Sequence, residues 1–405
     1  MSRTGQTWAD LPKELLETIV GHLDSRVDAL RFRSVCRSWR SVHYFRPETP
    51  CLHFKLPLIK PKAFLSQYAI CRLELPYQDP ASSSSSSQSK GWLTKVRKSR
   101  RGKLELMHPF STQKIVGSPI VLNLLDISLV QLSTSFLLTT SNEPSLLEIN
   151  KAVLFPASAK SYKKDEFAIL AIFCDGKLRY WRYGNEHWTL LDDKKFQYDD
   201  IIIYKGQFYV VDQWGTVSWI DSSLRVIQYA PPLYGCGGKK NLVESCGDLY
   251  VVDRYLDGMR RALIWNESDN TDRMLARRYN LLGRITPKAV DFRVYKLDEE
   301  RATWVNVKSL GDRAFFLGVD CSFSVSSKEF AAGKGNCIYF TDYEFYASKR
   351  LSEAVLVFKL EDGSIEQLSF LPEYREIFWP PNCPRHSNMS SVGWSRQFGH
   401  FGVPI

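Results

Sequence analysis

Apolar and polar positions near the start of the chain alternate with the period of an α-helix. Leu11, Leu15, Ile19 and Leu23 recur every four residues, and neighbouring apolar positions widen this stripe. That pattern is typical of a helix that buries one face. Asp10 is a residue type that caps helix N-termini, so we expect it to cap a helix that runs to about residue 23.

Two shorter apolar groups follow within the same segment. The apolar side chains of residues 27–32 predict a second helix, and those of residues 35–39 predict a third. Three short amphipathic helices in about forty residues cannot bury all of their apolar surface among themselves. The surplus must contact the rest of the chain or a partner.

These helices resemble an F-box, the module that binds the Skp-family adaptor of cullin–RING ubiquitin ligases. The resemblance rests on Leu11-Pro12 at the start, on the leucines that follow, and on Val35-Cys-Arg-Ser-Trp-Arg40 at the end. Some of the matching side chains must hold the helices together, and the sequence does not separate them from contact residues. The alternative is a helical cap that packs on its own domain. The resemblance implies adaptor contacts at Leu11, Pro12, Leu15, Leu16, Ile19, Leu23, Leu30, Val35, Cys36 and Trp39.

From about residue 104 the pattern changes to short apolar runs separated by turn residues. Residues 167–173 and 178–183 flank an Asp-Gly turn and predict a β-hairpin. The strand Gln-Phe-Tyr-Val-Val-Asp at 207–212 returns as Asp-Leu-Tyr-Val-Val-Asp at 248–253. A strand–turn–strand unit that repeats after about forty residues is typical of β-propeller blades. Five or six blades would fit the length.

The body of the chain also resembles plant F-box proteins that carry a C-terminal, kelch-like domain of unknown function. The matching pieces are 108–112, Trp304–Gly318, Gly335–Asp342 and Ile-Phe-Trp-Pro-Pro at 377–381. His108 stands where that family usually has Asn, and the segment after the Trp-Pro-Pro element departs from the usual tail. The resemblance implies that the propeller holds a target protein.

The predicted fold is a small all-α F-box module of three helices followed by a large all-β, β-propeller-like domain. We assign residues 5–48 to the F-box and 49–90 to a connector with a mobile serine-rich stretch. We assign residues 91–385 to the propeller and 386–405 to a C-terminal tail.

The basic run Lys95–Lys103 has two interpretations. Clustered Lys and Arg raise the local positive potential, as in a nuclear-localisation signal or a phosphate-binding run. Strand-like residues lie on both sides of the run, so we prefer a charged hairpin turn, with which a localisation signal is compatible.

Composition narrows the class of protein. The chain of 405 residues is 44% hydrophobic and 13% aromatic, and it carries a net charge of +10. The aromatic content favours strands, and the charge would attract an acidic or phosphorylated target. No signal peptide or membrane span is evident, so we expect the nucleus and/or the cytoplasm. The nine cysteines form no Cys-x-x-Cys pair, which argues against a zinc module or a disulfide framework.

Candidate chemistry is sparse. Gly235–Lys240 invites comparison with a phosphate-binding loop, but the motif is incomplete, so we expect an exposed loop between blades. The acidic pairs 192–193 and 199–200 are expected to face water. We expect four tryptophans to lie in blade cores rather than on a recognition surface: Trp181, Trp188, Trp214 and Trp219.

The sequence therefore predicts a non-catalytic substrate-recognition subunit of a Skp–cullin–F-box ubiquitin ligase. No catalytic residue, cofactor, metal, nucleic acid or membrane partner is expected. Two alternatives stay open. One is an adaptor-binding or scaffold protein that acts without ubiquitination of a target, and the other is a propeller enzyme with a metal in its central channel.

Overall fold

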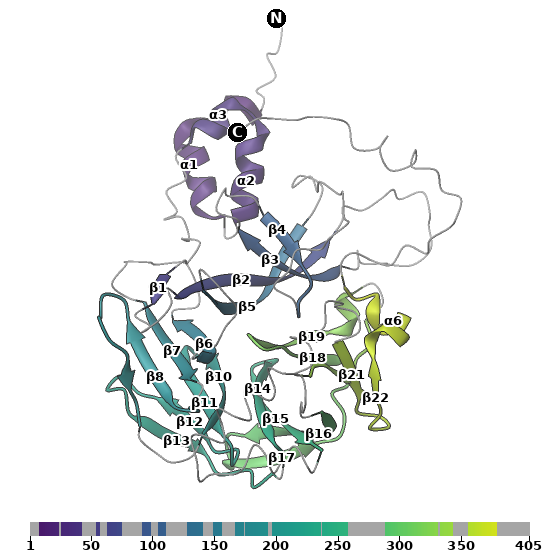
Figure 1. The fold of residues 1–405 in the computed structure, drawn as a ribbon. Helices are drawn as coiled ribbons and strands as arrows, with labels where there is room; N and C mark the ends of the chain where they lie inside the picture. The colour runs from purple at the N-terminus through teal and green to yellow at the C-terminus, as the bar shows by residue number, and fades with distance from the viewer. Residues whose placement is uncertain are drawn as a thin grey trace, which may run out of the picture.

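The N-terminal module contains three α-helices, as the pattern predicted. The computed structural model describes residues 8–23, 26–42, 54–56, 63–74, 91–98, 104–110, 128–140, 149–155, 167–173, 175–192, 197–235, 237–257, 288–330, 333–342 and 355–378. Figure 1 shows the helices as a separate group next to β3 and β4 of the body. The elements of the module are the 3₁₀ turn η1 (Trp8–Asp10) and the helices α1 (Lys13–Gly21), α2 (Arg26–Val35) and α3 (Arg37–Ser41).

The rest of the described chain forms five antiparallel or mixed sheets, here called blades 1 to 5 in chain order. Blade 1 contains β1 (Phe54–Leu56), β2 (Ala63–Glu74), β3 (Trp92–Lys98), β4 (Leu104–Met107) and β5 (Ser128–Thr140). Blade 2 contains β6 (Ile149–Phe155), β7 (Ala168–Phe173), β8 (Leu178–Arg182) and β9 (Thr189–Leu190). Blade 3 contains β10 (Tyr198–Tyr204), β11 (Gln207–Asp212), β12 (Val217–Ile220) and β13 (Val226–Ala230).

Blades 4 and 5 complete the ring, and the described residues include one short helical turn between strands of blade 5 and two more after its last strand. Blade 4 contains β14 (Lys239–Ser245), β15 (Asp248–Leu256), β16 (Ala289–Asp298) and β17 (Thr303–Val307). Blade 5 contains β18 (Arg313–Leu317), β19 (Ser322–Ser326), β20 (Cys337–Thr341), β21 (Val355–Lys359) and β22 (Ile365–Gln367). The turns are η3 (Ser327–Glu329), η6 (Leu368–Phe370) and α6 (Pro372–Arg375).

The sequence repeat marks equivalent strands of neighbouring blades. The two Tyr-Val-Val-Asp segments are β11 and β15, each the second strand of its sheet. The hairpin predicted around the Asp-Gly turn is β7–β8, with Leu170 paired to Tyr180. The predicted β-propeller is confirmed. Of the five or six blades that the sequence length allowed, the structure has five.

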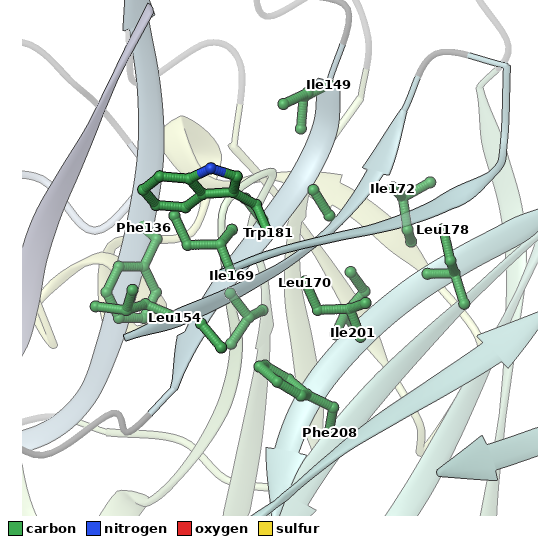
Figure 2. Packing of buried hydrophobic residues seen from close by; sticks show 14 of the residues in the cluster. Phe136, Ile149, Leu154, Ile169, Leu170, Ile172, Leu178, Trp181, Ile201 and Phe208 are labelled. Atoms are coloured by element: carbon green, nitrogen blue, oxygen red, sulfur yellow. The ribbon is translucent and has the colours of Figure 1, made fainter. Parts of the chain in front are cut away.

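Side chains from adjacent blades interdigitate to form the core. Between blades 2 and 3, Ile169, Leu170 and Ile201 are almost fully buried. Trp181 and Phe208 join them in the same cluster, as Figure 2 shows. Burying large side chains between sheets is favourable by roughly 1.5–3 kcal/mol each, which accounts for the high aromatic content of the strands.

The order of strands departs from a simple meander at both ends of the propeller. In blade 1, β5 returns to pair with β2 along its whole length. In blade 5, β18 pairs antiparallel with β19 and parallel with β20. The strand β2 lies in residues 49–90, which we assigned to a connector, so that boundary was wrong. The serine-rich stretch lies outside the described residues.

Blade 1 closes the ring by packing against blade 5. The backbone N–H of Leu93 donates to the carbonyl of Ile377 at 2.7 Å. Phe378 follows directly, and its ring packs 4.5 Å from the ring of His108 and 5.6 Å from that of Tyr339. Burial lowers the pKa of His108 to about 3, so this imidazole is neutral within the aromatic cluster.

A buried ion pair lies at the same closure. Lys95, on β3, contacts Asp320 of blade 5 with 2.6 Å between Nζ and Oδ2, and the Lys95 side chain is 1% exposed. Ser135 of β5 also donates to Asp320. The strands β3 and β4 form the predicted hairpin. Lys95 nevertheless does not belong to an exposed basic run, and residues 99–103 lie outside the described residues.

Other acidic residues join neighbouring blades instead of facing water. Asp200 is 1% exposed and accepts hydrogen bonds from Lys151 of blade 2 and from the Leu242 backbone of blade 4. Asp199 accepts from the Lys240 backbone at 2.8 Å, and burial raises the pKa of its carboxyl to about 6. The expectation that residues 199–200 face water was therefore wrong, because inner strands of adjacent blades meet there.

The loop Gly235–Lys240 joins blades 3 and 4, as expected, but its described residues are buried or half-buried rather than exposed. The Lys240 side chain is fully buried and forms an ion pair with Asp253 at 3.2 Å. Its Nζ also donates to the Gly237 carbonyl at 2.9 Å. A Cβ on Gly237 would come within 2.0 Å of Asp253 Oδ1, so only glycine fits. The glycines therefore serve close packing.

Candidate adaptor-binding surface

The helical module has a small core of its own. Leu16, Val20, Phe32 and Val42 are all buried in it, and Leu16 is 1% exposed. The rings of Phe32 and Trp39 lie 4.6 Å apart. Because these residues come from three separate helices, their contacts set the angle at which each helix presents its outer face.

Hydrogen bonds fix the two ends of the module to each other. The indole N–H of Trp39 donates to the Trp8 carbonyl at 2.9 Å. Cys36 is the N-cap of α3, where its Sγ accepts a hydrogen bond from the Trp39 backbone N–H at 3.5 Å. Cys36 and Trp39 of the Val-Cys-Arg-Ser-Trp motif thus have a structural role within the module.

The N-terminus of α1 differs from the prediction. Asp10 lies in η1, and the N-cap of α1 is Pro12, whose carbonyl accepts from Leu15 and Leu16. Pro12 has an extended ψ of 145° and begins the helix without a side-chain cap. Asp10 therefore does not cap α1, because Leu11 and Pro12 separate it from the first helical turn.

An apolar stripe on the outer face of the module remains exposed. Leu15 is 51% exposed and Ile19, one helical turn later, is 37% exposed. Pro12 is exposed at the start of the same helix, and Val35 is 54% exposed at the end of α2. Apolar side chains at i and i+4 lie on one face of a helix, so this stripe is available to a partner.

The structure divides the ten predicted contact residues by burial. Four of them are exposed: Pro12, Leu15, Ile19 and Val35. Four are half-buried: Leu11, Leu23, Cys36 and Trp39. Leu16 is in the core, and the side chain of Leu30 lies outside the described residues. Sequence reasoning missed Trp8, which is 75% exposed directly before the Leu-Pro motif.

The burial of two adjacent leucines leads to a testable difference in stability. We expect Leu16→Ala to destabilise the module by about 2–5 kcal/mol, because it empties the core position. Leu15→Ala should change the stability of the module by no more than about 0.5 kcal/mol, because that side chain is exposed. Hydrogen exchange of residues 13–42 in the full chain, read by mass spectrometry, measures both effects. Equal loss of protection in the two variants would contradict this division.

Aromatic side chains of the propeller follow the predicted burial with one exception. Trp181 is buried, and Trp188 and Trp219 are half-buried against the blade cores. Trp214 is 42% exposed, so the expectation of a core position was wrong for this residue. It lies in the turn after β11, beyond the last paired residues of the sheet.

The described ranges contain neither a candidate metal-ligand group nor a membrane-spanning helix. His, Cys, Asp and Glu nowhere gather there in a group of three that could hold a metal ion. Among the described helices, none is long and apolar enough to cross a bilayer. Burial raises the pKa of the Cys71, Cys321 and Cys337 thiols to about 12, so these groups stay protonated.

Fold and surface together define a two-module protein, in which a small helical module with an exposed apolar stripe is joined to a five-bladed propeller. An F-box-like family model matches residues 8–44, and a KIB1-4 beta-propeller model matches residues 59–364. The chain belongs to the family of F-box proteins that carry a KIB1-4 β-propeller.

Curated relatives with this organisation come from Arabidopsis thaliana. F-box protein SKIP23 is 31% identical over 399 residues, which cover 92% of this chain and 94% of that protein. F-box protein At2g17690 is 28% identical over 417 residues, covering 89% and 96%. F-box protein At2g17036 is 29% identical over 395 residues, covering 92% and 93%. The similarity therefore spans both modules.

Proposed function

We propose that this protein is the substrate-recognition subunit of a Skp–cullin–F-box ubiquitin ligase. The observation that carries the proposal is the exposed stripe of Pro12, Leu15 and Ile19 on a module with its own core. An F-box matched at this position implies a Skp-type adaptor as the partner of the stripe. The family to which the chain belongs, an F-box followed by a propeller, supports the same role.

In this role the protein performs no bond chemistry. The propeller holds a target protein while the adaptor connects it to the cullin and the ubiquitin-conjugating enzyme, so the contribution is proximity and orientation. Ubiquitination then leads to degradation of the target by the proteasome. The function requires no cofactor, nucleic acid or membrane, and it places the protein in the nucleus and/or the cytoplasm.

Replacing the two exposed aliphatic residues of α1, Leu15 and Ile19, tests the adaptor contact. We expect Leu15→Ala/Ile19→Ala to weaken adaptor binding at least tenfold, because each side chain would be buried only in the complex. Co-purification with a plant Skp-family adaptor, followed by titration calorimetry, measures the loss. Val305→Ala is the matched control, since that side chain is 49% exposed on blade 4.

Two results would overturn the proposal. The first is an intact chain that does not bind any Skp-family adaptor. The second is binding that the double variant retains at full strength while both proteins are folded. A third result would change the role. If the adaptor binds but no target protein accumulates in cells that lack this receptor, a scaffold role without ubiquitination replaces the receptor role.

A further inference from the structure

Blade 3 and the loop that follows it form a pocket whose lining includes two exposed aromatic residues, Trp214 and Tyr234. Its volume is about 280 Å³, just below the roughly 300–1,000 Å³ that small-molecule and cofactor sites usually have. Trp214 is 42% exposed and Tyr234 is 77% exposed, so both side chains reach solvent. The lining is formed by Tyr198, Asp212, Trp214, Thr216, Ser218, Gln228, Pro232 and Tyr234.

The two loops that carry these rings are held rigidly together. The Tyr234 backbone N–H donates to the Trp214 carbonyl at 3.2 Å. Gly215 approaches Leu233 so closely that a Cβ on the glycine would lie 2.5 Å from the leucine Cβ. Asp212 Oδ1 accepts from the backbone N–H groups of Trp214 and Thr216, at 2.8 and 2.9 Å. The pocket is therefore preformed, which reduces the ordering cost of binding.

Tyr234 adopts a backbone conformation that is unfavourable for its residue type. Its φ is 52°, in the left-handed region that favours glycine or asparagine. Such strained positions cluster at active sites and ligand-binding positions. A large, exposed ring kept at a strained position is consistent with a contact that binding uses.

The chemistry of the lining favours one type of ligand. Thr216, Ser218 and Gln228 place hydroxyl and amide groups that can donate hydrogen bonds along the polar side of the pocket. The Asp212 carboxylate is 4% exposed and already holds the turn, and no Lys or Arg is among the described lining residues. The site thus offers aromatic faces and hydrogen-bond donors rather than a charge to pair.

We propose that this pocket binds a proline-containing segment in the extended polyproline II conformation. Such a segment has carbonyls without internal partners, which need donors, and proline rings that pack on aromatic side chains. The pocket can take a few residues of an extended chain. That the segment belongs to the ligase target rests on the function proposed above, whereas the binding preference itself does not.

Fluorescence polarisation with labelled ten-residue peptides, added to the full chain bound to its adaptor, tests the proposal. The first peptide alternates alanine with paired prolines, the second replaces every proline by alanine, and two others replace the prolines by lysine or by glutamate. We expect saturable binding of the proline peptide only, at least tenfold tighter than binding of the alanine peptide.

Variants on both sides of the pocket connect binding to the site. Trp214→Ala and Gln228→Ala should each weaken the proline peptide at least fivefold, and Trp214→Phe should retain most of the affinity. Val305→Ala, on the outer strand of blade 4, should change nothing. Thermal unfolding shows whether each variant is folded. If Trp214→Ala does not fold, the affinity of Gln228→Ala for the proline peptide decides the test.

Each other result overturns the proposal. Preference for the lysine or glutamate peptide would assign the pocket to a charged segment, and no binding of any peptide would remove it as a peptide site. Binding that survives both the Trp214→Ala and Gln228→Ala changes would place the site elsewhere. The adaptor stays bound in every arm, so failure here is distinguishable from failure of the adaptor contact, which only the helical-module variants report.

Discussion

Asp320→Ala is expected to destabilise the propeller by about 3–5 kcal/mol, because it leaves the buried Lys95 ammonium without its partner. The Lys95 side chain is 1% exposed and that of Asp320 is 6% exposed. Burial alone would lower the pKa of Lys95, but the Asp320 carboxylate outweighs this effect and holds the pKa above its usual value. The pair therefore stays ionised at neutral pH.

A more exposed ion pair on the same hairpin provides the matched control. Arg97 and Glu105 lie 2.7 Å apart with side chains 33% and 15% exposed. Glu105→Ala should lower the free energy of unfolding by no more than about 1 kcal/mol, since the remaining Arg97 side chain is 33% exposed and can be solvated. Urea denaturation followed by tryptophan fluorescence measures both variants. The apolar double variant Lys95→Met/Asp320→Leu should recover most of the lost stability.

The comparison decides whether the pair holds the first and last blades together. If Asp320→Ala were no more destabilising than Glu105→Ala, Lys95 would not be buried at a closed junction. If the double variant were as unstable as Asp320→Ala, the loss would come from packing rather than from an unpaired charge.

Phe316→Ala is expected to cost about 3–5 kcal/mol, the range for removing a buried phenylalanine. Phe316 is fully buried in blade 5, with its ring 4.8 Å from that of Phe323 and 4.5 Å from that of Tyr339. It also contacts Phe110, which follows β4 of blade 1, with 6.0 Å between ring centroids. The substitution would remove packing both within blade 5 and across the closure.

Phe370→Ala is the control for this prediction, because the same residue type is 73% exposed near the end of blade 5. It should change the free energy of unfolding by no more than about 0.5 kcal/mol. The melting temperature of each variant, measured on the full chain, gives the comparison. A similar drop for both variants would show that the aromatic cluster around Phe316 is not packed as described.

Local patterns in the sequence were sufficient for the three helices and for the repeated strands. The four-residue spacing from Leu11 to Leu23 predicted α1, and the repeated Tyr-Val-Val-Asp segments predicted equivalent strands. Both signals depend on which side chains share a face over a few residues, so no knowledge of distant contacts is needed. The resemblance to F-box proteins was confirmed on the same residues.

Burial at individual positions could not be predicted in the same way. Leu15 and Leu16 are identical neighbours on one amphipathic helix, yet one is exposed and the other is in the core. Lys95 belongs to a run of basic residues, and its partner Asp320 is 225 residues later. Three other tryptophans pack in or against blade cores, but Trp214 lies in a turn beyond the paired strands and is exposed.

The sequence by itself determined that three helices precede a repeated strand domain, and which family motif the helices carry. The tertiary structure decided how the ring closes, which apolar residues stay available to a partner, and where a pocket forms. The physical reason is that helix and strand periodicity are properties of neighbouring residues. Burial and pairing instead depend on which distant segments the closed ring brings into contact.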